Sequence, residues 1–111
     1  MGEIYEDRRQ EPRFATAGKY SLELTKSSSL EGRILDLSLN GAMLERTSTS
    51  DLNSGGRHRL TLQFAGHPAF HGDALVVHAG KDRIGIEFYD MDPQNFAALS
   101  ALIEALTRAH R

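Results

Sequence analysis

The sequence of 111 residues contains no cysteine and no tryptophan, and only 7% of its residues are aromatic. Without cysteine the chain cannot form disulfides, thiolate zinc sites or a cysteine nucleophile. The sequence also lacks an excess of positive charge, since 13 Lys and Arg stand against 15 Asp and Glu and the net charge is −2. Both features argue against a domain that binds DNA or RNA, because such a domain needs a positive surface and exposed aromatic residues.

Long hydrophobic runs are absent as well. No apolar stretch approaches the roughly 18 residues that a membrane span requires, and the opening residues have no apolar core of a secretory signal. We therefore expect a cytoplasmic protein. The length suits one domain, and an apolar fraction of 40% is enough for one ordinary core.

Short segments with alternating apolar and polar residues dominate the chain after residue 14. This period of two is typical of strands that are buried on one face. Turn signals such as Ala65–Pro68 and Gly80–Asp82 separate the segments, and they are too short for the crossover connections of a parallel sheet. The alternation predicts six strands, at about residues 20–25, 33–37, 42–45, 59–64, 70–79 and 84–88.

Two further turns are predicted from composition. Residues 27–29 are three serines, which indicate a polar turn. Asn40-Gly41 is a tight-turn signal, because both residue types tolerate positive φ.

The period changes to that of a helix near the end of the chain. Asp92 is a suitable N-cap and Pro93 suits the first helical position. Apolar residues then recur at helical spacing, and we expect them to face the sheet. The sequence thus predicts a mostly β fold, a small six-stranded antiparallel barrel with a C-terminal α-helix at about residues 92–110. The apolar positions of this helix are Phe96, Leu99, Leu102, Ile103 and Leu106.

Two polar clusters are candidates for a functional site. The first holds Arg8, Arg9 and Arg13, in a charged segment that we expect to be flexible over residues 1–13. The second is Asp36-Leu37-Ser38-Leu39-Asn40-Gly41, between two predicted strands. Taken singly, the first fits a solvated, self-neutralising tail and the second fits an ordinary hairpin turn.

Together the two clusters resemble the signature of the PilZ domain family. That signature is Arg-x-x-x-Arg before a β-barrel, followed by Asp/Asn-x-Ser-x-x-Gly across the second and third strands. The matching residues are Arg9 and Arg13, then Asp36, Ser38 and Gly41. The last predicted strand and the C-terminal helix are also similar to the family pattern, so the resemblance spans essentially the whole chain after Arg8, with residues 14–111 as the PilZ barrel domain.

The resemblance implies a receptor for the bacterial second messenger cyclic di-GMP. The arginine fork suits phosphate oxygens and the O6/N7 edge of guanine, which are the roles implied for Arg9 and Arg13. Asp36 would accept hydrogen bonds from guanine, Ser38 would contact phosphate or ribose, and Gly41 would let the ligand approach the backbone.

A ligand-driven ordering of the arginine segment is the mechanism that we expect. The nucleotide would fix this segment against the barrel, and the change would signal to a downstream protein. In this family an arginine just before the motif accompanies binding of a stacked ligand dimer, so Arg8 would face a second molecule. The alternatives are a spare tail arginine and, for the whole chain, a PilZ-like adaptor that binds proteins and no nucleotide.

Other chemistries find little support in the sequence. His58, His67, His71 and His78 are scattered and lack a metal-binding motif, so we expect no metal ion and no cofactor. Neither a catalytic triad nor a phosphate loop has the required context. We therefore expect a binding protein and no enzymatic activity.

Overall fold

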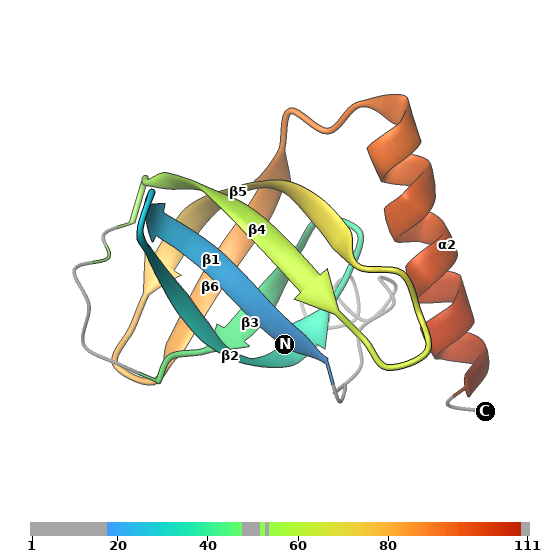
Figure 1. Cartoon of the computed structure of the whole chain (residues 1–111), viewed down its shortest axis with the longest axis horizontal. Coiled ribbons are helices and arrows are strands. Elements are labelled where there is room, and N and C mark those ends of the chain that lie inside the picture. Colours follow the sequence, from blue (N-terminus) through green and yellow to red (C-terminus); the bar gives the residue numbers. More distant parts are fainter. Residues whose placement is uncertain (1–17, 48–51, 53, 110–111) are drawn as a thin grey trace, which may run out of the picture.

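The computed structural model describes residues 18–47, 52 and 54–109. The described chain forms six strands and one long helix (Figure 1). The elements are β1 (Lys19–Thr25), β2 (Ser28–Leu37), β3 (Gly41–Glu45), β4 (Arg57–Gln63), β5 (Phe70–Ala79), β6 (Arg83–Tyr89) and α2 (Pro93–Ala109).

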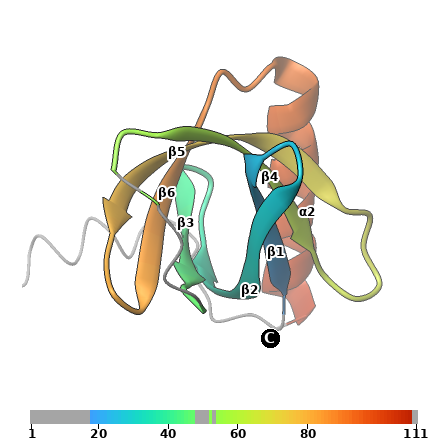
Figure 2. The same ribbon diagram turned by 60° about the vertical axis from the view of Figure 1, so that its left-hand side comes forward.

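The strands form one closed antiparallel barrel in the order β1-β2-β3-β6-β5-β4. Pairing between β1 and β4, for example Leu22 with Leu60, closes the barrel. The turned view shows the strands curving around one interior, with α2 packed outside them (Figure 2). This architecture confirms the predicted six-stranded antiparallel barrel with a C-terminal helix.

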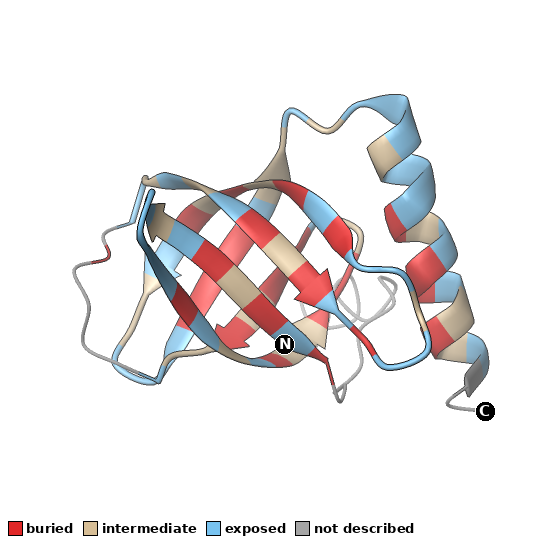
Figure 3. Cartoon of the chain, in the orientation of Figure 1, coloured by how far each residue is buried: buried red, intermediate tan, exposed pale blue. Residues whose placement is uncertain are grey.

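Alternation along each strand places the core inside the barrel. Buried and exposed residues alternate along the strands, as Figure 3 shows most clearly for β1 and β4. Leu22, Leu44, Leu60 and Ile84 are fully buried at 0% exposure, and complete burial of such a side chain contributes about 1.5–3 kcal/mol. The apolar residues of the predicted strands therefore provide the principal stabilisation of the fold.

A bulge in β2 departs from the simple alternation. Ile34 pairs with Leu44 and Asp36 pairs with Met43, so the register shifts by one residue at Leu35. Ile34 and Leu37 are three residues apart and both are buried, which a strand of period two allows only if one extra residue is inserted. The bulge therefore sets the direction of the Asp36 side chain.

The C-terminal helix α2 begins as predicted. The Oδ1 atom of Asp92 accepts a hydrogen bond from the backbone N–H of Asn95 at 2.7 Å, the geometry of an N-cap. Leu99, Ile103 and Leu106 are buried in the same cluster as the barrel core. Asn95 also donates from Nδ2 to the carbonyl oxygen of His71 at 3.0 Å, which links the start of α2 to β5.

One predicted turn was wrong. Ser28 and Ser29 belong to β2, where they pair with Thr25 and Glu23 of β1. The hairpin turn is shorter than predicted, because Ser28 and Ser29 pair with β1 and exposed serines fit on the solvent-facing side of a strand.

No helix in the described part of the chain is long and apolar enough to cross a membrane.

Candidate functional site

The turn between β2 and β3 carries the second polar cluster. Ser38 is only 1% exposed, and its backbone N–H donates to the carbonyl oxygen of Gly41 at 2.9 Å. Its Oγ accepts a hydrogen bond from the N–H of Asn40 at 3.3 Å and donates one to the carbonyl oxygen of Gly41 at 3.4 Å. The serine hydroxyl is therefore used inside the turn, where it holds the backbone.

Asp36 lies immediately before this turn, at the end of β2. The residue is half-buried, and its Oδ1 atom is shielded from solvent. It pairs with Met43, which lies between the inward residues Ala42 and Leu44 and therefore points outward. The carboxylate of Asp36 thus belongs to the outer face of the barrel.

Gly41 begins β3 and packs directly against β6. A Cβ atom at this position would overlap the carbonyl oxygen of Ile86 and come within 3.1 Å of the Cα of Glu87. The predicted tight turn is present, since the Ser38 N–H to Gly41 oxygen hydrogen bond closes it, although neither Asn40 nor Gly41 has a positive φ. Close contact between the two strands, and not a left-handed turn, is what requires glycine here.

The strand register reveals a row of outward positions that begins at Asp36. Asp36 pairs with Met43, Met43 pairs with Gly85, and Gly85 pairs with His78. Gly85 is buried and has no side chain of its own, and a Cβ there would meet side-chain atoms of His78, Val77 and Met43 at ordinary distances of 3.4 to 3.9 Å. Sequence reasoning missed this row, since only the pairing of β3, β6 and β5 brings its members together.

The first polar cluster lies outside the described residues. Arg8, Arg9 and Arg13 are therefore not placed, whereas Asp36, Ser38 and Gly41 are brought together at one turn. The described chain resumes at Gly18, whose carbonyl oxygen accepts a hydrogen bond from the N–H of Ile34 at 3.0 Å. The chain that follows the arginines thus enters the barrel beside β2, two residues from Asp36.

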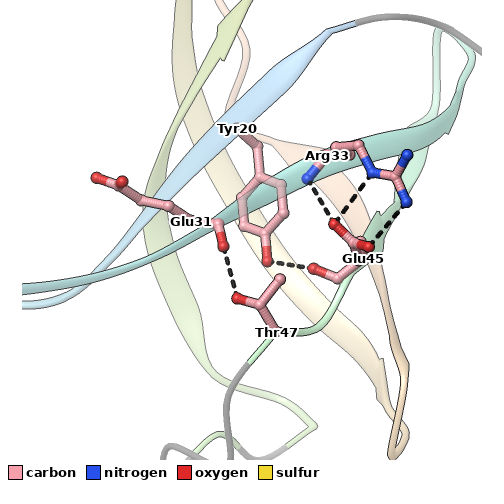
Figure 4. A network of polar contacts seen from close by, with 5 residues as sticks. All are labelled: Tyr20, Glu31, Arg33, Glu45 and Thr47. Atoms are coloured by element: carbon pink, nitrogen blue, oxygen red, sulfur yellow. Dashed lines mark hydrogen bonds and ion pairs between the residues drawn. The ribbon is translucent and has the colours of Figure 1, made fainter.

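A separate polar network joins β1, β2 and β3 (Figure 4). The Arg33 guanidinium donates to Glu45 from Nε and Nη2, at 3.4 and 3.1 Å. The Tyr20 hydroxyl donates to the carbonyl oxygen of Glu45 at 2.6 Å, and its ring occupies the space left by Gly32. This network connects the end of β3 to β1 and β2, and the Arg33 side chain is bound within it.

These contacts shift the pKa values of two residues in the network, Tyr20 and Glu45. Burial, together with the negative charge of Glu45, raises the pKa of Tyr20 to about 12, although Arg46 acts in the opposite direction. Hydrogen bonds from the side chain and backbone of Arg33 lower the pKa of Glu45. The tyrosine is therefore neutral, and the carboxylate charged, throughout the physiological range.

The four described histidines lie apart from one another on the barrel. His58 Nδ1 lies 2.8 Å from the carbonyl oxygen of Glu23, and His71 Nδ1 lies 3.0 Å from the Thr61 hydroxyl. Within residues 18–47, 52 and 54–109, no three His, Cys, Asp or Glu side chains are placed to hold a metal ion.

Comparison with known proteins gives one family by sequence. The model of the PilZ domain matches residues 7–105, which include both polar clusters and the whole barrel. No curated protein matches the sequence closely enough to add a relative.

Three solved structures with the same fold are between 17% and 22% identical to this chain in sequence. The structure titled "PilZ domain with c-di-GMP of YcgR from Escherichia coli" has a TM-score of 0.82 at 22% identity, with 94% of this chain and 95% of that chain covered. The MrkH–c-di-GMP complex from K. pneumonia has a TM-score of 0.77 at 17% identity and covers 93% of this chain and 54% of its own. A PilZ domain of CeSA from a cellulose-synthesising bacterium has a TM-score of 0.68 at 19% identity, covering 86% and 97%.

Proposed function

We propose, since the chain belongs to the PilZ domain family, that it is a receptor for cyclic di-GMP whose arginine segment closes over the bound nucleotide and signals to a downstream protein. The solved PilZ domain of YcgR and the MrkH complex both contain this ligand. The observation that carries the proposal is the placement of Asp36, Ser38 and Gly41 at one turn, next to the point where the chain from Arg13 enters the barrel.

The covalent chain supports access of the arginines to this turn. Four residues lie between Arg13 and Gly18, so the two Cα atoms are at most about 17 Å apart. Gly18 is hydrogen bonded to Ile34, two residues before Asp36. Arg13 is therefore within reach of a ligand beside Asp36. Arg9, four residues before Arg13 in the sequence, can approach the same ligand from another side.

Each residue type suits one part of the nucleotide. Guanidinium groups of Arg9 and Arg13 would bind phosphate oxygens or the O6/N7 edge of guanine. The Asp36 carboxylate would accept from the N1–H and N2–H₂ donors of guanine. Ser38 would act mainly by holding the turn in shape, because its hydroxyl is already buried and bonded there.

The outward row across β3, β6 and β5 offers a surface for a flat base. Gly85 adds no side chain to this surface, Met43 and Val77 lie beside it, and the exposed His78 borders it on β5. A purine held by Asp36 at one end would lie over Met43 and Gly85, where apolar contact with Met43 adds to the polar contacts. We propose this face as the platform of the first ligand, with Arg8 available to a second, stacked molecule.

Thermal unfolding tests the proposal against the adaptor that binds no nucleotide. At a free ligand concentration of 100 times Kd, cyclic di-GMP should stabilise the chain by about 2.7 kcal/mol, and cyclic di-AMP, whose adenines lack the guanine donors, should stabilise it much less. Substitution of Asp36 by Ala should remove the shift, whereas Glu31→Ala, an exposed change on the same strand, should retain it. No shift with either nucleotide would support the adaptor, whereas equal shifts with both would contradict the recognition of guanine by Asp36.

A further inference from the structure

An apolar groove lies between α2 and the connection from β4 to β5, away from the Asp36 row. Its volume is about 340 Å³. Apart from His67, its lining is apolar, and it is formed by Pro68, Ala69, Phe70, Ala98, Ala101, Leu102 and Ala105. The proposed nucleotide site uses none of these residues, so the groove has no role in that function.

The helix beside the groove has an unusual outer face. Ala97, Ala98 and Ala101 are exposed, and Glu104 and Arg108 are the only charged residues of α2. A surface helix normally presents polar residues to solvent, whereas these alanines expose an apolar strip beside the groove. The helix and the groove therefore form one apolar surface that none of the described residues covers.

The charges at the two ends of this surface identify its occupant. The exposed carboxylates of Asp90 and Asp92 lie at the N-terminal end of α2, and the exposed Arg108, which also pairs with Glu104 at 3.5 Å, lies at the C-terminal end. A second α2 running antiparallel would bring Arg108 of each copy to the acidic end of the other. The opposed helix dipoles would also compensate each other.

We infer that the groove binds α2 of a second copy of this chain, so that two antiparallel helices form a twofold dimer. A twofold contact uses the same surface on both copies, and this surface meets that condition through its acidic and basic ends. The small side chains of Ala98, Ala101 and Ala105 let the helix axes approach to about 8 Å. The helix of 17 residues is about 25 Å long, and Pro68 and Ala69 widen the contact on one side.

Sedimentation equilibrium of the full chain tests the dimer directly. Its contact is small beside a standard interface of about 800 Å² per partner, so we expect a reversible dimer whose fraction rises from micromolar to millimolar concentration. A chain that remains monomeric throughout this range overturns the inference.

A single cysteine tests the position of the contact. Because the chain has no cysteine, Ala101→Cys provides one thiol close to the expected twofold axis. Mild oxidation should link this variant into a dimer, whereas Lys26→Cys, in the turn between β1 and β2, should remain monomeric at the same concentration. Equal cross-linking of both variants would show random collision and overturn the inference.

A charge reversal tests the antiparallel arrangement. Arg108→Glu should weaken dimerisation about tenfold, because each of two symmetric ion pairs becomes a repulsion. Arg83→Glu is the matched control, since this exposed arginine lies at the start of β6 and should not affect dimerisation. Circular dichroism checks that both variants fold, and unchanged dimerisation of folded Arg108→Glu would overturn the arrangement.

Discussion

Gly41 of β3 lies directly against the carbonyl oxygen of Ile86 in β6, so that no Cβ atom can be placed between them. We expect Gly41→Ala to lower the free energy of unfolding by about 3 kcal/mol, because the two strands must separate to admit a methyl group. Urea unfolding monitored by circular dichroism measures this loss.

Gly85→Ala is the matched control for that measurement. Its Cβ would meet atoms of His78, Val77 and Met43 at 3.4 to 3.9 Å, which are ordinary contacts. The expected change in stability is below about 1 kcal/mol. If the two variants were equally stable, the tight contact at Gly41 would not be the reason for glycine there.

The fold was largely predictable from the sequence, because the alternation was clean where strands are buried on one face. β5 has the predicted bounds Phe70–Ala79, and Asp92 caps α2 as expected. The start of β2 was predicted five residues late, since exposed serines carry no apolar signal. The bulge at Leu35 could have been found from the two apolar positions Ile34 and Leu37, whose odd spacing breaks the period of two.

The candidate site was predictable only in part. Asp36, Ser38 and Gly41 are close in sequence, so a local motif was enough to group them. Met43, Gly85 and His78 join the same face only through the register of three strands, which the sequence does not specify. The reason for glycine at position 41 also depends on β6, which is more than forty residues away in sequence.

The Tyr20 hydroxyl gives the fold a pH-dependent contact. Loss of its hydrogen bond to Glu45 in Tyr20→Phe should cost about 1 kcal/mol at pH 8. The folded pKa of about 12 exceeds the ordinary value of 10, so ionisation disfavours the folded state. The stability that the neutral hydroxyl provides is complete below pH 10 and decreases as the pH rises toward 12.

Urea unfolding of the parent and Tyr20→Phe at several pH values between 8 and 11 checks this expectation. The advantage of the parent should shrink above pH 10, because only the parent has this ionisable group. A constant difference between the two proteins across the range would contradict the raised pKa.

Arg9 and Arg13 should contribute most of the affinity for the nucleotide. Removal of one charge-assisted contact costs roughly 1.5–3 kcal/mol, so Arg9→Ala and Arg13→Ala should each raise Kd about tenfold or more. Arg59→Ala is a suitable control, because its side chain is bonded to Asp73 on the outer face of β4 and β5. Variants of Arg9 or Arg13 that bind as tightly as the parent would refute their assignment.

Arg8 should determine the number of ligands. The parent chain should bind two molecules of cyclic di-GMP, and Arg8→Ala should lose or greatly weaken the second while the first remains. Calorimetric stoichiometry measures this number. A value of one ligand for the parent would mean that Arg8 is an ordinary residue of the tail.

Calorimetric titration of the folded parent chain with cyclic di-GMP is the most direct test of the receptor function. The account predicts saturable heat with a Kd in the micromolar range or tighter, which corresponds to at least about 8 kcal/mol. No heat and no thermal stabilisation with the nucleotide in large excess would contradict it.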